Sequence, residues 1–224
     1  MEYFLEVLAK LIPFLRVTIY IAFMSMLLGL LFGSLLAAMK ISRSRILKRI
    51  ASLYITMIRC TPVIVLLFLS YYGFPVLFKL FGADISGFSK TFFSIVALTM
   101  YSSGVLAEII RPAFQSVDKG QYEAAVTAGL TGFQALRIII LPQVFFVALP
   151  NFGNMLIALI QESSLAFLIG VVDIMGQAKV INAMSYGVHI LSIYLAASVL
   201  YWIMSLIVGK FVDTATYRIG KILR

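Results

Sequence analysis

Five stretches of this chain contain no charged residue and approach or exceed the length of a membrane-spanning helix. They are residues 17–39, 60–78, 91–107, 138–161 and 180–209. A helix needs about 17–25 residues to cross the hydrocarbon core of a bilayer. Lipid offers no hydrogen-bond partner to the backbone, so a spanning segment satisfies its N–H and C=O groups internally, as a helix does. The chain is therefore predicted to be an all-α membrane protein.

The composition supports this class, since 62% of the residues are hydrophobic and only 12% are charged, about half the share in a typical soluble domain. The predicted spans form one domain over residues 1–224 and lie at about 17–39, 54–78, 91–110, 144–162 and 180–209.

Several segments outside and within these spans carry further predictions. Residues 1–16 are predicted to form an amphipathic lead-in. Residues 163–172 are too few to cross the membrane and are predicted to be re-entrant or interfacial. Pro62 and Pro75 are expected to kink the second span, and Pro150 is expected to break the fourth.

The net charge of +9 orients the chain in the membrane and does not indicate a nucleic-acid partner. With five spans, one side of the bilayer receives Lys40, Arg43, Arg45, Lys48, Arg49, Arg111, Lys119, Arg137, Lys210, Arg218, Lys221 and Arg224. The other side receives Lys10, Arg16, Lys79, Lys90 and Lys179. Because cytoplasmic loops carry the excess of Lys and Arg, the N-terminus is predicted outside and the C-terminus in the cytoplasm.

Residues for catalysis or metal binding are sparse. Cys60 is the single cysteine and His189 the single histidine, so no cysteine cluster and no Ser-His-Asp set are expected. A lone histidine in an apolar span is usually a packed residue. No G-x-x-x-x-G-K-[ST] loop is present to cradle nucleotide phosphates. We therefore expect no catalytic residue, no metal and no cofactor in this chain, which is not an enzyme by itself.

Residues 111–142 interrupt the apolar pattern with two helix-start signals. Asp118 followed by Gln121, and Thr131 followed by Gln134, have the spacing of an N-cap with a reciprocal partner three residues later. The segment is therefore predicted to form two short helices joined by a corner.

The corner and its first helix have a distinct composition. Gly129 fits the left-handed residue that ends a helix, and Pro142 is predicted to turn the chain toward the fourth span. The small residues Ala124 and Ala125 permit close approach of another backbone, and Glu123 beside them can orient it. Helix physics leaves two interpretations open, a docking element for another protein or an interfacial hairpin resting on headgroups.

The same segment resembles the cytoplasmic EAA motif of ABC importer permeases, which reads EAA, three residues, G, nine residues, I-x-L-P. The matching residues are Glu123, Ala124, Ala125, Gly129, Ile139, Leu141 and Pro142. Similarity to the polar amino-acid uptake branch covers about residues 17–210 and is strongest over 101–178. Cys60 and the pair Pro112-Ala113 depart from the usual sequence of that branch.

The resemblance implies a type I importer fold, with five transmembrane helices and a cytoplasmic coupling segment at 111–142. It implies a permease subunit that moves a polar amino acid across the bacterial cytoplasmic membrane by alternating access. The implied partners are ABC ATPase subunits that bind ATP and Mg²⁺, a second permease copy or paralogue, and an extracytoplasmic solute-binding protein. The alternative is an ion-coupled secondary amino-acid transporter, which has no need of an EAA segment.

Polar residues inside the fourth span indicate where substrate could pass. Asn151, Asn154 and Gln161 recur at helical spacing on one face, and Glu162 lies at its edge. Intramembrane ionisable residues tend to mark pathways, so this face is predicted to line the path. Further candidates for the path are Ser163, Ser164 and Tyr101.

Structural pairing is the other interpretation of these polar groups. Glu162 could pair with Lys179 or Arg59, with the asparagines joining helices by hydrogen bonds. Glu108 and Arg111 are three residues apart and are predicted to pair, with Arg59 as a possible third member.

Overall fold

The computed structural model describes residues 2–222; Met1, Leu223 and Arg224 lie outside this range, and with them one of the predicted cytoplasmic cations. The described chain is helical, and five of its helices are long and apolar enough to span a membrane, which confirms the predicted fold class. The helices are α1 (Glu2–Leu11), α2 (Leu15–Ile41), α3 (Arg45–Cys60), α4 (Val63–Phe68), α5 (Phe74–Leu80), α6 (Lys90–Gln115), α7 (Lys119–Thr127), α8 (Gly132–Gln134), α9 (Leu141–Glu162), α10 (Ile174–Met184) and α11 (Ile190–Ile222).

The lead-in and the first span form one continuous rod. A short 3₁₀ turn, η1 (Ile12–Phe14), joins α1 to α2. Pro13 lies at the start of that turn, where its missing N–H is tolerated. The rod runs over Glu2–Ile41, 40 residues. At 1.5 Å per residue it is about 60 Å long, about twice the hydrocarbon thickness, so part of it extends beyond the membrane core.

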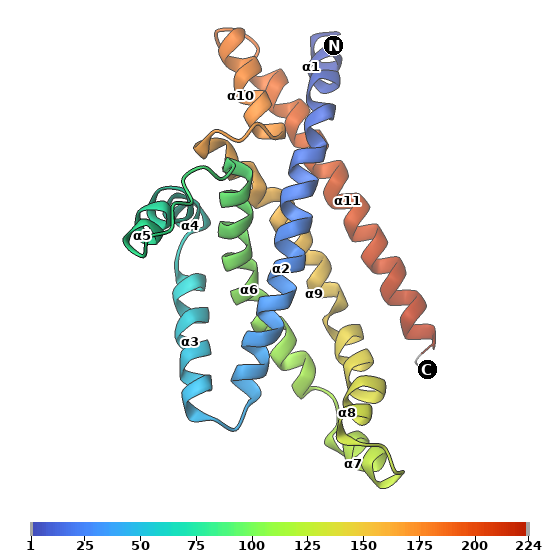
Figure 1. Ribbon diagram of the computed structural model, residues 1–224. Coiled ribbons are helices and arrows are strands. Elements are labelled where there is room, and N and C mark those ends of the chain that lie inside the picture. Colours follow the sequence, from blue (N-terminus) through green and yellow to red (C-terminus); the bar gives the residue numbers. More distant parts are fainter. Residues whose placement is uncertain (1, 223–224) are drawn as a thin grey trace.

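The core of the protein is the contact between α2 and α6, which run side by side (Figure 1). Ser25, Gly29 and Gly33 recur every four residues on α2 and are buried. A Cβ atom on Gly29 would lie 2.1 Å from the Ser102 hydroxyl of α6. That hydroxyl donates a hydrogen bond to the Ser25 carbonyl at 3.1 Å. A stripe of small residues thus lets two backbones approach closely, as in membrane helix pairs.

The second apolar helix begins later than the pattern predicted. α3 ends at Cys60, the chain bends at Thr61 and Pro62, and the apolar run continues over Val63–Leu80. The break lies inside the predicted span 54–78. Its cause is Pro62, which cannot continue the hydrogen-bond ladder and restricts Thr61 to an extended conformation (φ −97°, ψ 126°). Figure 1 shows α3 alongside α2, with α4 and α5 turned away from it.

Three other prolines are accommodated without a turn. A π-helical turn, η3 (Ala135–Ile140), connects α8 to α9, so that Pro142 lies in the first turn of an uninterrupted helix. The predicted turn at Pro142 is therefore wrong, because the wider π turn absorbs the missing N–H. Pro150 also lies within α9, which continues through it, so the predicted helix break is wrong as well. A second π turn, η2 (Leu69–Gly73), precedes Pro75 in the same way.

The segment after α9 folds back against the first and last helices. It consists of a 3₁₀ helix, η4 (Ser163–Ile169), a left-handed Gly170 (φ +83°) and α10, which packs on α11 and α1. The chain then turns at Tyr186 and Gly187, both with positive φ. The last span consequently begins at Ile190 and not near residue 180.

Asp173 is the buried polar centre of this region. Its carboxylate caps α10 by accepting the Gly176 N–H at 2.8 Å, and it also accepts the hydroxyls of Tyr201 (3.1 Å) and Thr18 (3.4 Å). Burial raises the pKa of the Asp173 carboxyl, and these hydrogen bonds oppose the rise. One carboxylate therefore links α2, α10 and α11.

Candidate coupling segment and polar path

The start of α7 is capped as predicted, but by a single bond. Asp118 Oδ1 accepts the Gly120 N–H at 2.9 Å. The reciprocal partner predicted at Gln121 is wrong, because the Gln121 side chain lies against α9 instead. Its Oε1 accepts a hydrogen bond from Gln143 Nε2 at 2.6 Å. The first helix of the coupling segment is thereby tied to the helix that follows the corner.

The corner between α7 and α8 is built from local backbone rules. Gly129 has φ +94°, and the Leu130 N–H donates to the Ala125 carbonyl at 3.1 Å, the hydrogen bond of a Schellman helix end. Thr131 and Gln134 then form a complete capping box, with bonds of 2.8 and 3.3 Å in the two directions. Both features were predicted from the sequence, and together they set the angle at which α7 projects.

The seven motif residues occupy two neighbouring surfaces of this corner. Glu123 and Ala124 are exposed on α7, whereas Ala125 is buried beneath them. Ile139, Leu141 and Pro142 lie after the corner, on η3 and the start of α9. A hollow of about 710 Å³ separates α7 from the ends of α6 and α2. Figure 1 shows α7 and α8 at the tip of the molecule farthest from the N-terminus. The corner is thus a small projection on which Glu123 is exposed.

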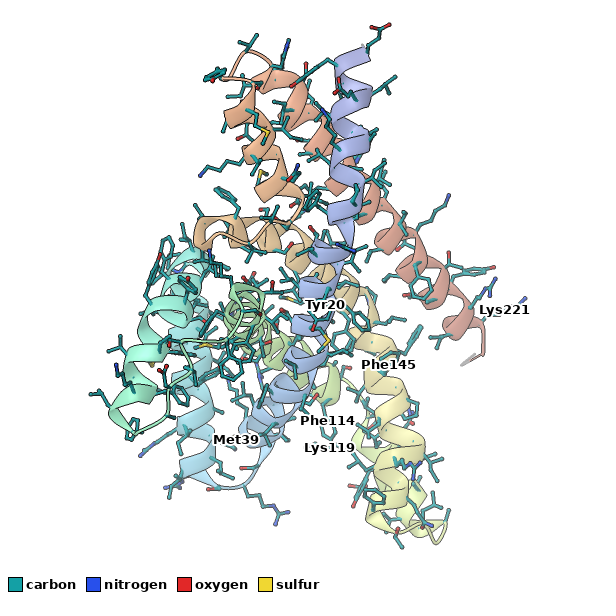
Figure 2. All side chains as sticks on the ribbon, turned by 45° about the horizontal axis from the view of Figure 1, so that its top comes forward. Tyr20, Met39, Phe114, Lys119, Phe145 and Lys221 are labelled. Carbon is teal, nitrogen blue, oxygen red and sulfur yellow. The ribbon has the colours of Figure 1, made fainter. Side chains whose placement is uncertain are left out.

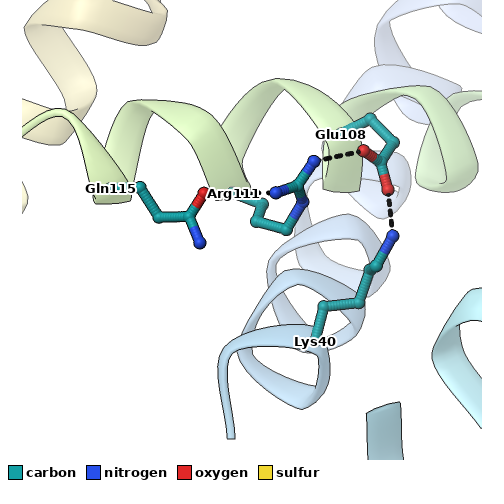
Figure 3. A network of polar contacts seen from close by, with 4 residues as sticks. All are labelled: Lys40, Glu108, Arg111 and Gln115. Atoms are coloured by element: carbon teal, nitrogen blue, oxygen red, sulfur yellow. Dashed lines mark hydrogen bonds and ion pairs between the residues drawn. The ribbon is translucent and has the colours of Figure 1, made fainter. Parts of the chain in front are cut away.

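A cluster of charged groups joins α2 to α6 close to this projection (Figure 3). Glu108 accepts from Lys40 Nζ at 2.5 Å and from an Arg111 Nη at 3.0 Å, and Arg111 also donates to the Gln115 side-chain oxygen at 3.1 Å. The predicted Glu108–Arg111 pair is confirmed. Arg59 is exposed and takes no part, and Lys40 occupies the third place. The sequence had indicated Lys40 only as one of the basic loop residues.

Replacing Glu108 by glutamine is expected to lower the free energy of unfolding by about 1–3 kcal/mol, since two charge-assisted hydrogen bonds are lost while two cations stay partly buried. The side chains of the cluster are only 18–31% exposed. Thermal unfolding of the purified protein in lipid nanodiscs measures the change. Glu6→Gln is the matched control, because it breaks an ion pair whose side chains are more than half exposed, so that water and salt screen it. Equal shifts for the two variants would contradict the prediction.

The polar face of α9 lies on the surface of the single chain. Asn151, Asn154 and Gln161 are exposed, and Glu162 is half-buried. No hydrogen bond or ion pair involves the Glu162 carboxylate within residues 2–222. The alternative in which Glu162 pairs with Lys179 or Arg59 is therefore not observed. The Lys179 ammonium lies over the Phe167 ring instead, 4.7 Å from its centroid.

The remaining path candidates differ in what they can offer. Tyr101 on α6 is half-buried, on the helix that packs against α9. Ser164 is half-buried, and its hydroxyl has no hydrogen-bond partner among the described residues. Ser163 is fully buried and donates its hydroxyl to the Ile160 carbonyl at 2.8 Å, so it is turned into its own helix. Ser164 and Glu162 thus lie two residues apart at the end of the polar face, and the Tyr101 hydroxyl has no hydrogen-bond partner among the described residues.

An exposed polar face on a membrane helix requires a cover other than lipid. A charged or strongly polar side chain in the bilayer centre is unfavourable by about 2.5–3.5 kcal/mol on insertion scales. The polar groups on α9 would face hydrocarbon if the chain were alone. The arrangement is suited to a surface that another protein subunit covers.

Comparison with known proteins agrees with this geometry. Residues 29–219 match the family described as binding-protein-dependent transport system inner membrane component. The L-cystine transport system permease protein TcyL of Bacillus subtilis (strain 168) is 39% identical over 208 residues, which cover 93% of this chain and 86% of that protein. The probable amino-acid ABC transporter permease protein PatM of Vibrio harveyi is 34% identical over 220 residues, covering 98% and 96%.

Solved structures place the same fold in the same class. The crystal structure of an amino acid ABC transporter with histidines superposes with a TM-score of 0.79 at 34% identity, over 94% of each chain. The inward-facing MetNI methionine ABC transporter superposes with a TM-score of 0.74 at 21% identity, over 98% of this chain and 99% of that one, which indicates a shared fold. With its EAA corner, its five spanning helices and these matches, the chain belongs to the inner membrane components of binding-protein-dependent transport systems, as an amino-acid permease subunit of an ABC importer.

Proposed function

We propose that two copies of this chain, or one copy and a close paralogue, enclose the path between their α9 helices. The observation that carries this proposal is the exposed row of Asn151, Asn154 and Gln161, with Glu162 at its end and without a partner among residues 2–222. Each chain supplies one polar wall, and facing walls give the solute hydrogen-bond partners that lipid cannot give. The N-terminus lies outside and the C-terminus in the cytoplasm, as the distribution of Lys and Arg favours.

The solute is a polar amino acid carrying an ammonium group, cationic or zwitterionic. Glu162 is the acidic group on the path, and its partly dehydrated carboxylate attracts a cation more strongly than a hydrated one would. Tyr101 and Ser164 add hydroxyls beside it. The name of TcyL, which gives L-cystine as its solute, is consistent with a zwitterionic amino acid. A dicarboxylic solute would meet repulsion at this position.

The work of transport comes from ATPase subunits that dock on the corner at α7. They bind ATP and Mg²⁺, and their closure moves the coupling segment and changes the side to which the path opens. A solute-binding protein delivers the amino acid from outside. Glu123 and Ala124 are exposed on α7, and Gly129 holds that helix at its angle, which is what a docking projection needs.

Reconstitution in proteoliposomes tests this function. Liposomes that hold the permease, its ATPase subunits and its solute-binding protein are expected to accumulate a radiolabelled amino acid only when ATP is present on the side of the ATPase. Vesicles without the ATPase, carrying a proton or sodium gradient, are the control. Accumulation in those vesicles at an equal rate would contradict an ATP-driven mechanism.

A further inference from the structure

A groove lies at the end of the molecule that carries the coupling segment. Its volume is about 940 Å³, enough for a small solute with its water. α7 contributes Gln121, the start of α9 contributes Gln143, Phe146 and Val147, and the end of α11 contributes Thr216 and Lys221. The groove therefore lies between α7, which is the coupling helix, and the helices α9 and α11.

The side of α9 that lines the groove continues along the helix as its polar face. Steps of four, four, three, four and three residues lead from Gln143 through Val147, Asn151, Asn154 and Ala158 to Gln161. Steps of three and four keep residues on one side of a helix. α9 is uninterrupted over Leu141–Glu162, so the row runs its full length. Its members are exposed or half-buried throughout. Glu162 lies at one end of this row. Gln143 and Val147, at the other end, line the groove.

α11 closes one side of the groove by packing tightly against α9. A Cβ atom on Gly153 of α9 would lie 2.6 Å from Val212 of α11, and one on Gly220 of α11 would lie 3.1 Å from Phe146. With glycine at both crossing points the two helices approach closely, so a solute that follows the row cannot leave between them. The open side is the side of the polar row.

The groove lining carries one charge and several polar groups. Lys221 is the single charged residue that lines it within the described chain, and Figure 2 places Lys221 at the end of α11. The Thr216 hydroxyl oxygen is buried without a hydrogen-bond partner among the described residues. Pro150 lacks the N–H that would bond the carbonyl of Phe146. These groups suit an amino acid. Its carboxylate would bind the Lys221 ammonium, and its polar atoms would bind the Thr216 hydroxyl oxygen and the Phe146 carbonyl oxygen.

We propose that this groove is the inner exit of the transport path and that the coupling helix itself forms part of its wall. The inference rests on the proposed function, and it adds the place where the amino acid leaves the protein. The hydrogen bond of 2.6 Å between Gln143 and Gln121 joins the path helix to α7. A movement of α7 driven by the ATPase therefore changes the shape of the exit directly, without passing through the rest of the bundle.

Cysteine modification tests the exit. Cys60, which is exposed, is first replaced by serine, and Val147→Cys is added to that background. A membrane-impermeant, positively charged methanethiosulfonate reagent, applied from the ATPase side, is expected to modify residue 147 and slow ATP-driven uptake about tenfold or more. Asn151→Cys, one turn farther along the row, is the second variant and should behave likewise.

Phe145→Cys is the matched control (Figure 2). Phe145 is 51% exposed and Val147 46% exposed, so the two sites are equally open in the single chain. Two positions apart on a helix, they point to nearly opposite sides. Modification at residue 145 should leave uptake unchanged. Normal uptake after complete modification at 147 and 151, or equal loss of uptake at 145, would overturn the proposal.

Two further outcomes separate the possible errors. If the unmodified wild-type transporter does not import with ATP, the proposed function fails. If it imports normally but ATPase subunits alone, without nucleotide, protect residue 147 from the reagent, the groove is an ATPase contact and the exit proposal is overturned. Gln121→Leu and Gln143→Leu, singly and together, measure the tie. If the double variant loses no more uptake than either single variant, the tie is supported. If the double variant loses the sum of the two single losses, the tie is contradicted.

Discussion

Replacing Gly129 by valine is expected to abolish most ATP-driven uptake while leaving the protein folded in the membrane. Gly129 adopts φ +94°, which L-residues rarely adopt, and a Cβ atom added there would have no neighbour within 4 Å among the described residues. The effect therefore acts through the backbone and not through a clash. A left-handed conformation costs a non-glycine residue about 1–2 kcal/mol, and the β-branched side chain of valine makes it worse.

The strain is relieved most easily by opening the corner. The bond from the Leu130 N–H to the Ala125 carbonyl depends on the conformation of Gly129, so a change there loosens the end of α7. If the ATPase docks on α7 as proposed, a changed corner moves Glu123 and Ala124 away from it. We expect ATP hydrolysis to persist but to lose its stimulation by the loaded solute-binding protein, with uptake reduced about tenfold or more.

Uptake and ATPase activity of reconstituted complexes check this result together. Gly209→Ala is the matched control, since Gly209 lies inside α11 with open space around it, where alanine favours the helix. It should leave uptake and stability unchanged. If Gly129→Val transports at the wild-type rate with an unchanged dependence on ATP, the corner is not the coupling element.

Replacing Glu162 by glutamine is expected to reduce uptake of a cationic or zwitterionic amino acid about tenfold or more. The change removes one charge and keeps the shape of the side chain. A carboxylate that holds an ammonium group in a partly dehydrated site contributes on the order of 1–3 kcal/mol through charge-assisted hydrogen bonds. Because Glu162 has no ion-pair partner within residues 2–222, its replacement breaks no ion pair of the described chain.

Initial rates of uptake over a range of solute concentrations measure this effect. Glu2→Gln is the control, because Glu2 is exposed at the far end of α1, away from the polar face of α9. Thermal unfolding should be unchanged for both variants, which separates transport from folding. Unchanged affinity and rate for every amino acid tested with Glu162→Gln would remove Glu162 from the path.

The corner between α7 and α8 was predictable because its rules are local. Asp118, Gly129 and the Thr131–Gln134 box each act over three or four residues of chain, and the structure forms them as the sequence indicates. Gln121 is the exception. Its spacing from Asp118 fits a reciprocal cap, but α9 offers the amide of Gln143, and the side chain bonds there instead. The signal for this contact was present, since Gln143 is a polar residue in the same helical row as Asn151.

The positions of the helix breaks were harder to predict, because a proline has several outcomes. Pro62 ends α3, whereas Pro142 and Pro150 lie inside one continuous helix. Proline removes one backbone donor in each case, and whether the chain bends depends on whether a π turn, or packing on both sides, keeps the helix together. Periodicity and composition do not contain that information.

By itself, the sequence determined that the chain is helical, that it resides in a membrane and that it carries an EAA corner, because hydrophobic run length and helix capping are properties of consecutive residues. Only the tertiary structure decided which polar groups meet. Lys40 reaches Glu108 across 68 positions, Gln143 reaches Gln121 across 22, and Thr18 reaches Asp173 across 155. Such pairs depend on how close two helix backbones approach and how they are rotated. The same packing brings Lys40 to Glu108, beside Arg111 of its own helix, and brings no cation to Glu162 within the described chain.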